Sequence, residues 1–416
     1  MKTTQDHELE GEAAGAVDES VEMMGQRHVH AAVGPTPRTT APIPSEGHDL
    51  TGRIDVFVHP HRLKFRFPAG TSRGVYLTRD ILVLELVDTV TGAFGFGECA
   101  PLPDLSIDAA PMEVLERRLL AAALHSIHHG GPDAEALRGH PSVLFALETA
   151  WRHLRVGSPA LYETAFSKGA AGIPINGLVW MGTFEEMRAR IDAKLSEGFT
   201  CLKLKIGAID FEDEFELLRR IRRRWSPEDL VVRVDANGGF TPGEAMEKLD
   251  RLATLGLHSI EQPVKAGMTD VLARICRESP LPVALDEELI RVTGADDRRR
   301  LLEEVRPAHV VIKPGLHGGF AGAAEWISEA KRIGAGWWIT SALESNIGLN
   351  AIAQWTARFA PSAHQGLGTG ALFTENFGEG IRVERGRLHF DPKAAQRSFT
   401  REALSGWLER GRDAGL

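Results

Sequence analysis

The chain has 416 residues, 43% of them hydrophobic, which is enough to bury a sizeable core and to build two or more domains. A formal net charge of −9 without a dense basic run argues against non-specific nucleic-acid binding, and no apolar run is long enough to cross a membrane. The N-terminus lacks a continuous apolar signal segment, and Cys99, Cys201 and Cys276 form no CxxC motif. These features predict a protein of the cytoplasm, where thiols stay reduced.

Residues 1–52 are expected to form a disordered extension, because they are polar and lack a sustained apolar period. The pattern of apolar and polar residues changes over residues 53–168. Two strand-like regions, IDVFVHPHRLKFRF and ILVLELVDTVTGAFGFGE, precede two segments with helical spacing, which predicts an α+β module. The segment FPAGTSRGVYLTRD between the two strand-like regions is expected to be a mobile loop.

Strand-like and helix-like segments alternate over residues 169–374. Polar residues end successive strand-like runs at intervals of 24 to 30 residues, about one βα unit each, which predicts an eight-stranded (β/α) barrel with these residues at its open end. An open doubly wound sheet fits less well, because too many successive strands contribute polar residues. Residues 375–416 are expected to return and pack on the first module. The strand-end positions are Asn176, Lys205, Asp235, Glu261, Asp286, Lys313, Ser341 and Gln365.

Three acids, Asp235, Glu261 and Asp286, end three successive strands of this barrel. Neighbouring strands lie about 4.8 Å apart, so the three carboxylates would crowd together. A divalent cation relieves the repulsion between such anions, and an all-oxygen ligand set favours Mg²⁺ over zinc. Three protein ligands leave coordination positions open for water or substrate.

Lysines stand on both sides of the acids. Lys203 and Lys205 form a K-x-K pattern within one strand, so both side chains point to the same face, into the barrel. Two adjacent cations are expected to depress each other's pKa, which suits one of them to act as a base. Lys313 lies four strands beyond Lys205, which places it across the barrel. This arrangement suits removal of a proton next to a metal-bound carboxylate.

The motifs K-x-K, D-x-N, E-Q-P and D-E and the strand-six lysine together resemble the enolase superfamily, in its muconate lactonising enzyme subgroup, over roughly residues 54–390. The strand-seven histidine of the mandelate racemase subgroup has no counterpart in WWITSALES. A closer similarity to the o-succinylbenzoate synthase family lies in PAGTSRGV, GFGECAPLPDLS, IPINGLVWMG, SALESNIGLNAIAQW and HQGLGTGALF. The resemblance implies a modified (β/α)7β barrel, with residues 53–168 as the N-terminal part of a capping domain.

The resemblance also implies a role for each matching residue. Asp235, Glu261 and Asp286 would bind Mg²⁺, for which Mn²⁺ is a possible substitute. Lys205 would remove the α-proton of a small carboxylate substrate, 2-succinyl-6-hydroxy-2,4-cyclohexadiene-1-carboxylate, and return it to the departing hydroxyl, while Lys313 stabilises the charge. Lys203 would tune Lys205, and Asn237 would support the metal shell or cap the turn that follows. The implied substrate-binding positions are Thr71, Ser72, Arg73, Gly74, Ser341, Glu344 and Gly368.

Several alternatives stay open. N-succinylamino acid racemases, muconate cycloisomerases and dipeptide epimerases of the same superfamily use the same lysines and metal, although HQGLGTG lacks the acidic pair usual in dipeptide epimerases. A Schiff-base aldolase would need a lysine but not the three acids. A non-catalytic binding barrel is disfavoured by the intact set of lysines and ligands. Members of the superfamily often form dimers or larger assemblies, so a homo-oligomer is possible.

Overall fold

The computed structural model of the protein describes residues 47–71, 74–207 and 209–412, which belong to one compact unit. Nearly all of the extension predicted over residues 1–52 lies outside the described residues.

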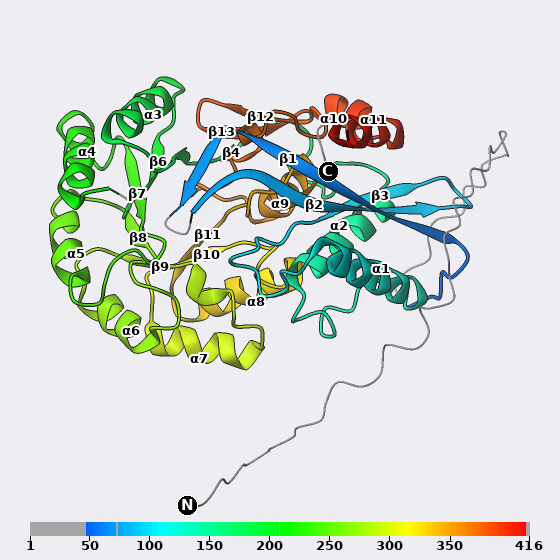
Figure 1. Ribbon diagram of the computed structural model, residues 1–416, viewed down its shortest axis with the longest axis horizontal. Coiled ribbons are helices and arrows are strands. Elements are labelled where there is room, and N and C mark those ends of the chain that lie inside the picture. The colour runs from blue at the N-terminus through cyan, green and yellow to red at the C-terminus, as the bar shows by residue number, and fades with distance from the viewer. Residues whose placement is uncertain (1–46, 72–73, 208, 413–416) are drawn as a thin grey trace, which may run out of the picture. The chain divides into compact units, whose positions relative to one another are not determined.

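An antiparallel sheet in the order β1-β2-β3 opens the described chain, and α1 and α2 pack on it (Figure 1). The run ILVLELV in β2 is apolar on both faces, apart from Glu85, because both faces are covered. Leu82 and Leu84 pack with residues of α1 and α2, whereas Ile81 and Val83 join the core that continues into the barrel. The elements are β1 (Ile54–Thr71), β2 (Gly74–Asp88), β3 (Phe94–Cys99), α1 (Met112–His128) and α2 (Pro141–Val156).

The prediction of a loop over residues 67–80 is wrong in the length of the loop. Strand β1 continues to Thr71 and β2 begins at Gly74, and Ala69 pairs with Tyr76 and Thr71 with Gly74. The register shifts between Lys64 and Ala69, as in a β-bulge, so the strands bend and then resume pairing. Glycines and a serine suggested a loop, but cross-strand backbone hydrogen bonds override that local preference. The segment is therefore the end of a long hairpin.

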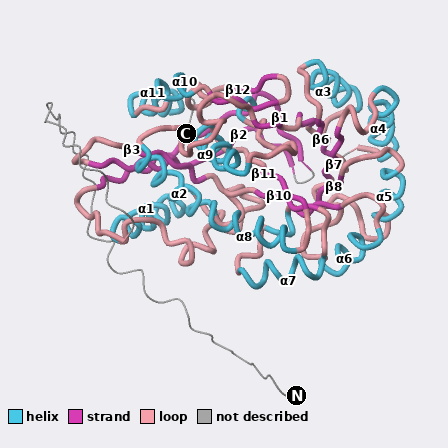
Figure 2. Tube along the Cα trace, turned by 180° about the vertical axis from the view of Figure 1, so that it is seen from behind, coloured by secondary structure: helices cyan, strands magenta, loops and turns pink. Residues whose placement is uncertain are grey.

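A seven-stranded parallel sheet in the order β11-β10-β9-β8-β7-β6-β5 curls into the barrel (Figures 1 and 2). The eighth position is filled by Gln365 and Gly366, which bridge in parallel to Ile175 on one side and to Thr340 on the other. Two residues close the ring, and no helix follows within the barrel. The strands are β5 (Gly177–Val179), β6 (Cys201–Lys205), β7 (Val231–Asp235), β8 (Ser259–Glu261), β9 (Val283–Leu285), β10 (His309–Ile312) and β11 (Gly336–Ile339).

Helices α3 to α9 follow the seven strands in turn and, from α3 to α7, visibly line the outside of the barrel (Figure 2). The alternation confirms the predicted (β/α)7β architecture. A capping box between Thr183 and Glu186 fixes the start of α3. The helices are α3 (Phe184–Ser196), α4 (Phe211–Arg224), α5 (Ala245–Ala253), α6 (Thr269–Glu278), α7 (Ala295–Val305), α8 (Gly319–Arg332) and α9 (Asn346–Thr356), with short 3-10 turns η1 (Glu287–Leu289), η2 (Ala357–Phe359) and η3 (Gly370–Leu372).

Side chains fill the barrel interior, so it is a packed core, and it forms the floor of the cleft described below. Ala284, Val311 and Trp338 form a separate apolar cluster from three strands. The guanidinium of the buried Arg233 lies 3.9 Å from the centroid of the Trp338 ring, a cation–π contact that sets the ring in place. Trp338 also lines the cleft described below, so this stack supports its floor.

The C-terminal segment touches both the start of the barrel and the antiparallel sheet. Strand β13 pairs with β4, so that Leu388 lies opposite Ile173. Helix α11 packs on β1, with the Trp407 and His61 ring centroids 3.8 Å apart. The elements are β4 (Ile173–Pro174), β12 (Ile381–Glu384), β13 (Arg387–Phe390), α10 (Pro392–Ser398) and α11 (Arg401–Arg412).

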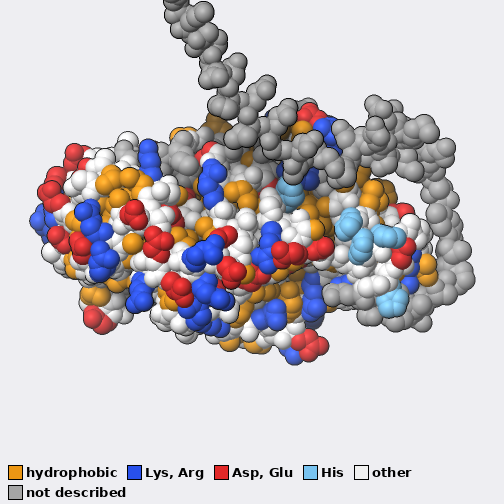
Figure 3. Space-filling view, turned by 90° about the horizontal axis from the view of Figure 1, so that it is seen from below, with side chains coloured by type: hydrophobic (Ala, Val, Ile, Leu, Met, Phe, Trp, Pro, Cys, Tyr) orange, Lys and Arg blue, Asp and Glu red, His pale blue; other side chains and the backbone are white. Residues whose placement is uncertain are grey.

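Cationic and anionic side chains are interspersed on the face shown in Figure 3. Opposite charges also form ion pairs within single helices, such as Arg219 with Glu216. Water screens exposed pairs of this kind, so they contribute little to stability. In the described part of the chain, none of the helices combines the length and apolar character needed to span a bilayer.

Two carboxylates of the N-terminal module cap barrel helices. Glu98 on β3 accepts hydrogen bonds from the backbone N–H of Ser345 (2.8 Å) and Gly348 (2.9 Å), at the start of α9. Glu148 on α2 accepts from the backbone N–H of Phe320 (2.5 Å) and Ala321 (3.1 Å), at the start of α8. The first N–H groups of a helix have no partner within it, so these contacts satisfy them across the boundary between module and barrel.

Burial raises the pKa of Glu148 to about 7, and the two backbone N–H groups only partly oppose it. The folded protein then keeps a proton that the unfolded chain releases above about pH 4.5. We therefore expect the free energy of unfolding to fall as the pH rises from about 4.5 to about 7, by roughly 3 kcal/mol from this residue. Urea unfolding at several pH values would measure the slope in the wild type and in Glu148→Gln, which cannot ionise. Equal slopes in the two proteins would contradict this assignment.

Candidate active site and metal centre

Three buried carboxylates meet at the carboxyl ends of neighbouring strands. Asp235 ends β7, Glu261 ends β8, and Asp286 directly follows β9. Asp235 and Glu261 are register partners, and a turn after β9 brings Asp286 to them. One oxygen of each acid lies within 4.8 Å of the others, as expected from the spacing of parallel strands.

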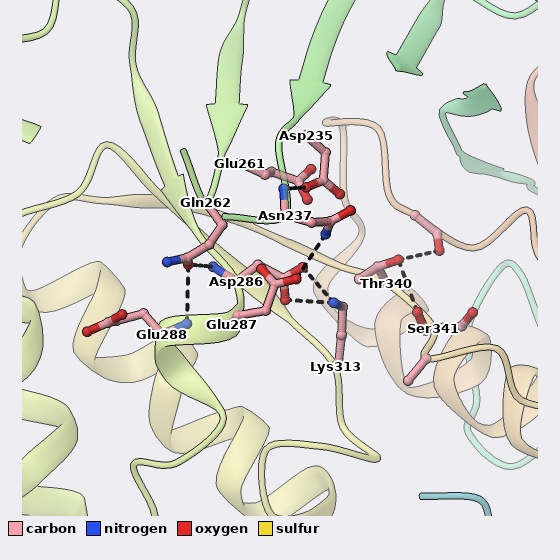
Figure 4. Close-up of polar contacts among 12 residues, drawn as sticks. Asp235, Asn237, Glu261, Gln262, Asp286, Glu287, Glu288, Lys313, Thr340 and Ser341 are labelled. Carbon is pink, nitrogen blue, oxygen red and sulfur yellow. Dashed lines mark hydrogen bonds and ion pairs between the residues drawn. The ribbon is translucent and has the colours of Figure 1, made fainter. Parts of the chain in front are cut away.

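The three lysines contact this cluster from two sides. Lys203 donates to Glu261 and lies 3.0 Å from Oδ2 of Asp235. Lys205 donates to the same Asp235 oxygen at 2.9 Å. Lys313, on the opposite side of the barrel, donates to both oxygens of Asp286 at 2.6 Å (Figure 4). Each carboxylate is thus paired with at least one ammonium group.

The neighbours of each carboxyl decide its pKa. Burial alone raises the pKa of Asp235, but Lys203 and Lys205 outweigh it and hold that pKa far below its ordinary value. Glu261 differs: burial raises its pKa to about 7, with the Asp235 and Asp286 carboxylates adding to the rise, although Lys203 opposes it. Asp235 is therefore ionised at neutral pH, whereas the surroundings of Glu261 favour its charged form less strongly.

The expected depression of lysine pKa values does not hold for Lys203. Burial lowers the pKa of its ammonium group, but the carboxylates of Asp235 and Glu261 hold it well above its ordinary value. Lys203 therefore stays charged beneath the cluster, where it compensates two anions.

The cluster has the donors that a divalent cation requires. Glu261 Oε1 is buried and accepts no hydrogen bond within the described part of the chain, so one ligand oxygen lacks a partner. Leaving a buried acceptor unpaired costs free energy, and an ion at this point would satisfy it. The oxygens of Asp235, Glu261 and Asp286 fit a hard cation, so the cluster could hold a divalent metal ion.

Two side chains that follow the acids brace the cluster (Figure 4). Gln262 is fully buried, and its Oε1 accepts from the backbone N–H of Asp286 and of Glu288, both at 3.2 Å. Asn237 accepts from Lys205 at 2.7 Å and donates to Glu287 at 2.9 Å. Both residues have positive φ, 38° for Gln262 and 44° for Asn237. Such backbone strain persists where surrounding contacts hold it, often at functional sites.

The contacts of Asn237 bear on its two predicted roles. It bridges the lysine side of the cluster to η1, rather than only capping the turn that follows. Gln262 was not singled out from the sequence as a site residue, although it belongs to the E-Q-P motif.

A cleft of about 790 Å³, counting the part open to solvent, lies over the cluster and between the hairpin and the barrel. Lys205 and Lys313 line it from strands β6 and β10, which stand on opposite sides of the closed ring. The rest of the wall is largely apolar and aromatic. It includes Tyr76, Leu102, Leu105, Asn176, Leu178, Trp180, Lys203, Asn237, Trp338, Thr340, Ala342, Leu343, Gly366 and Thr369.

Only some of the predicted substrate-binding residues line this cleft. Ser341 and Gly368 line it, and the Ser341 hydroxyl lies 2.5 Å from that of Thr369. Glu344 is buried behind the wall, where it accepts from the backbone N–H of Ala342 at 2.6 Å.

The structure describes only some of the substrate-binding positions predicted in the hairpin. Thr71 and Gly74 pair at the end of the hairpin, but the Thr71 side chain, together with all of Ser72 and Arg73, lies outside the described residues. Three aromatic residues that were not predicted from the sequence, Tyr76, Trp180 and Trp338, also line the cleft; their bulk near strand ends was the available signal.

The carboxylate cluster predicts cation-dependent stability. A cation that binds only the folded state raises the midpoint of thermal unfolding. At a cation concentration of a hundred times the dissociation constant, the free energy of unfolding rises by roughly 2.7 kcal/mol. We expect Mg²⁺ or Mn²⁺ to raise the Tm of the wild type, and Asp286→Asn, which removes one ligand charge, to weaken binding at least about 100-fold by calorimetry. Glu288→Gln is the matched control, because Glu288 bonds Gly267 and Thr269 and belongs to no part of the cluster. A full Tm shift in Asp286→Asn would rule out this metal centre.

Comparisons with known proteins agree with the geometry. Residues 186–394 match a family described as enolase C-terminal domain-like. The chain is 43% identical over 356 residues to o-succinylbenzoate synthase from Desulfotalea psychrophila, a match that covers 78% of this chain and 96% of that protein.

Comparison with solved structures identifies the same family. The crystal structure of MenC from Desulfotalea psychrophila matches with a TM-score of 0.69 and 37% identity, over 81% of this chain and 100% of that one. Muconate lactonizing enzyme from Pseudomonas putida shares the fold, with a TM-score of 0.68 and 19% identity over 86% of this chain and 98% of that one. The chain therefore belongs to the enolase superfamily, in the subgroup that holds the muconate lactonising enzymes and the o-succinylbenzoate synthases.

Proposed function

We propose that the protein is a Mg²⁺-dependent dehydratase that converts 2-succinyl-6-hydroxy-2,4-cyclohexadiene-1-carboxylate to o-succinylbenzoate, a step of menaquinone biosynthesis. One observation carries the proposal. Lys205 and Lys313 face one cleft from opposite sides of the barrel, with three buried carboxylates between them, in a chain 43% identical to an o-succinylbenzoate synthase.

Asp235, Glu261 and Asp286 would hold the metal. Their ligand atoms are all oxygens, which favours Mg²⁺, and Mn²⁺ could replace it because it accepts the same ligands. When bound, Mg²⁺ would supply positive charge next to the substrate carboxylate, whose negative charge grows as the neighbouring proton leaves. Gln262 and Asn237 would keep the ligands and Lys205 in place through the contacts described above.

Lys205 is the base of the proposed reaction. In its neutral form, Nζ takes the proton from the carbon that bears the carboxylate, and the electron pair of that C–H bond spreads onto the carboxylate as an enediolate. The pair then forms the ring double bond to the neighbouring carbon as the C–O bond to its hydroxyl breaks. Lys205 returns the same proton to the departing oxygen, so that water leaves and the ring becomes aromatic. One lysine serves both steps if proton and hydroxyl lie on the same face of the ring, as in a syn elimination.

Lys313 and Lys203 have different tasks. Lys313 approaches from the other side of the cleft, where its ammonium charge stabilises the anion that forms when the proton leaves. Lys203 lies deeper, between Asp235 and Glu261, and tunes the charge around Lys205. The aromatic wall near Lys205 includes Trp180, whose ring centroid lies 6.0 Å from the ammonium nitrogen. Low polarity around the reacting groups strengthens these charge interactions.

Racemisation of N-succinylamino acids is the second candidate. It is favoured by the two lysines on opposite faces, since one can remove the α-proton and the other can deliver a proton to the opposite side. Ser341, Gly368 and the hairpin residues Thr71, Ser72, Arg73 and Gly74 remain proposed contacts to either substrate, and Glu344 is proposed to act on the substrate site only through the wall residue Ala342, from whose backbone N–H it accepts a hydrogen bond. No acid lines the cleft among the described residues, which disfavours substrates with a free amine.

We infer that the protein works in the cytoplasm. Its three cysteines are all free thiols, and Cys99 and Cys201 are buried, as is usual where disulfides do not form. A homo-oligomer remains a proposal that light scattering of the purified protein would test.

The assay follows directly from these roles. We expect the purified protein to dehydrate the cyclohexadiene substrate with Mg²⁺ present and to lose activity with EDTA. Lys205→Ala should lower kcat at least about 1000-fold, because the only proposed base is removed. Its Tm should still rise with Mg²⁺, which would show that the metal centre is intact.

Lys248→Ala is the control, because Lys248 pairs with Glu244 outside the cleft and should leave kcat unchanged. N-succinylamino acids and dipeptides are assayed in parallel. A wild type that racemises N-succinylamino acids but does not dehydrate the cyclohexadiene would replace the first candidate with the second. Full activity of Lys205→Ala would refute the mechanism and leave the fold untouched.

A further inference from the structure

A single buried arginine joins two loops that form the cleft wall. Arg79 lies on β2, and its Nε donates to the backbone carbonyl of Leu343, 264 residues along the chain, at 3.0 Å. Its terminal nitrogens donate to the carbonyls of Pro101, at 3.3 Å, and of Ala100. One guanidinium therefore contacts the loop after β11 of the barrel and the loop after β3 of the N-terminal sheet.

Both loops contribute directly to the cleft. Leu102, next to Pro101, and Leu105 line it from the first loop, and Leu343 lines it from the second. The first loop is braced further by the Ser106 hydroxyl, which accepts from the backbone N–H of Leu102 at 2.8 Å. The hydrogen bonds of Arg79 thus act on the residues that set the width of the cleft between sheet and barrel.

The backbone of Leu343 needs such support. Its φ is 67°, in the left-handed region that residues with a β-carbon rarely adopt. Strained conformations of this kind persist where the surroundings hold them. The carbonyl of Leu343 is held by Arg79, and its N–H contacts the Ser341 hydroxyl at 3.4 Å. Arg79 provides the shorter of these two contacts and the one that comes from another part of the fold.

The site also selects arginine over lysine. A guanidinium has five N–H donors in a fixed plane, so it can reach three carbonyls that lie in different directions, whereas an ammonium group cannot match that geometry. Two buried carboxyls, Glu98 and Glu344, lie close enough to interact with the Arg79 charge. A buried arginine without an acidic neighbour would be costly, and Arg79 in turn opposes the rise that burial causes in the pKa of both carboxyls.

We propose that Arg79 is a positioning residue. It fixes the position of the cleft wall because it joins the loop at Ala100 and Pro101 to Leu343 across the boundary between sheet and barrel. It touches no catalytic lysine or metal ligand among the contacts above, so its effect falls on how the substrate fits rather than on proton transfer. The kinetic part of this inference rests on the proposed function, and the structural part does not.

The kinetic test uses the full-length enzyme and the variant Arg79→Lys, which keeps the charge but not the fork of donors. We expect KM to rise about tenfold while kcat stays within about threefold, because lost hydrogen bonds loosen the wall and leave Lys205 and Lys313 in place. Arg62→Lys is the matched control. Arg62 lies on the neighbouring strand and pairs with Asp80 at 2.5 Å and 2.9 Å, away from both loops, so its kinetic constants should not change. A kcat loss without a KM change, or a lower Tm with both constants unchanged, would overturn the proposal.

The structural test does not depend on activity. Hydrogen–deuterium exchange is followed in peptides that cover residues 99–107 and 340–349, in the wild type and in both variants. Arg79→Lys should speed exchange in both peptides about tenfold or more, and Arg62→Lys in neither. Unchanged exchange, or faster exchange in one peptide alone, would show that Arg79 does not join the two loops. A wild type without dehydratase activity would refute the proposed function, yet this experiment would still decide the role of Arg79.

Discussion

The architecture depends on gathering three carboxylates in a space where they repel one another. Asp235, Glu261 and Asp286 have ligand oxygens within 4.8 Å and almost no contact with solvent. Burial disfavours each charge and the others add to the cost, so compensation by positive charge is obligatory. Lys203, Lys205 and Lys313 supply it from strands β6 and β10, and a metal ion would add to it. The site is thus a charge-balanced core that also reaches an open cleft.

Holding such a cluster in place requires rigid surroundings. Gln262 and Asn237 adopt left-handed backbone conformations at the ends of β8 and β7, and their side chains bridge from one strand end to the next. Leu343 is strained in the same way in the loop that follows β11. Each strained residue is held by hydrogen bonds from elements distant in sequence, which is how fold stability can maintain local strain at a functional site.

The N-terminal module does more than cover the barrel. Glu98 and Glu148 satisfy the first N–H groups of α9 and α8, and Arg79 holds the loop between β11 and α9. Three ionisable side chains of one module therefore complete backbone hydrogen bonding in the other. Because the cleft lies between the two, any change in how they fit alters the cleft wall together with stability. This coupling explains why the proposed substrate contacts come from both parts.

Local patterns in the sequence were sufficient to predict the barrel and to place its lysines and acids at the strand ends. Side chains alternate along a strand and strand ends recur every 24 to 30 residues, and neither pattern depends on contacts between distant residues. Which groups touch one another follows from the folded structure. Strand β1 continues to Thr71 and β2 begins at Gly74, Glu344 lies behind the cleft wall, and the pKa of Lys203 is raised instead of lowered. These outcomes depend on contacts between residues tens to hundreds of positions apart, which exist only once the ring of strands has closed.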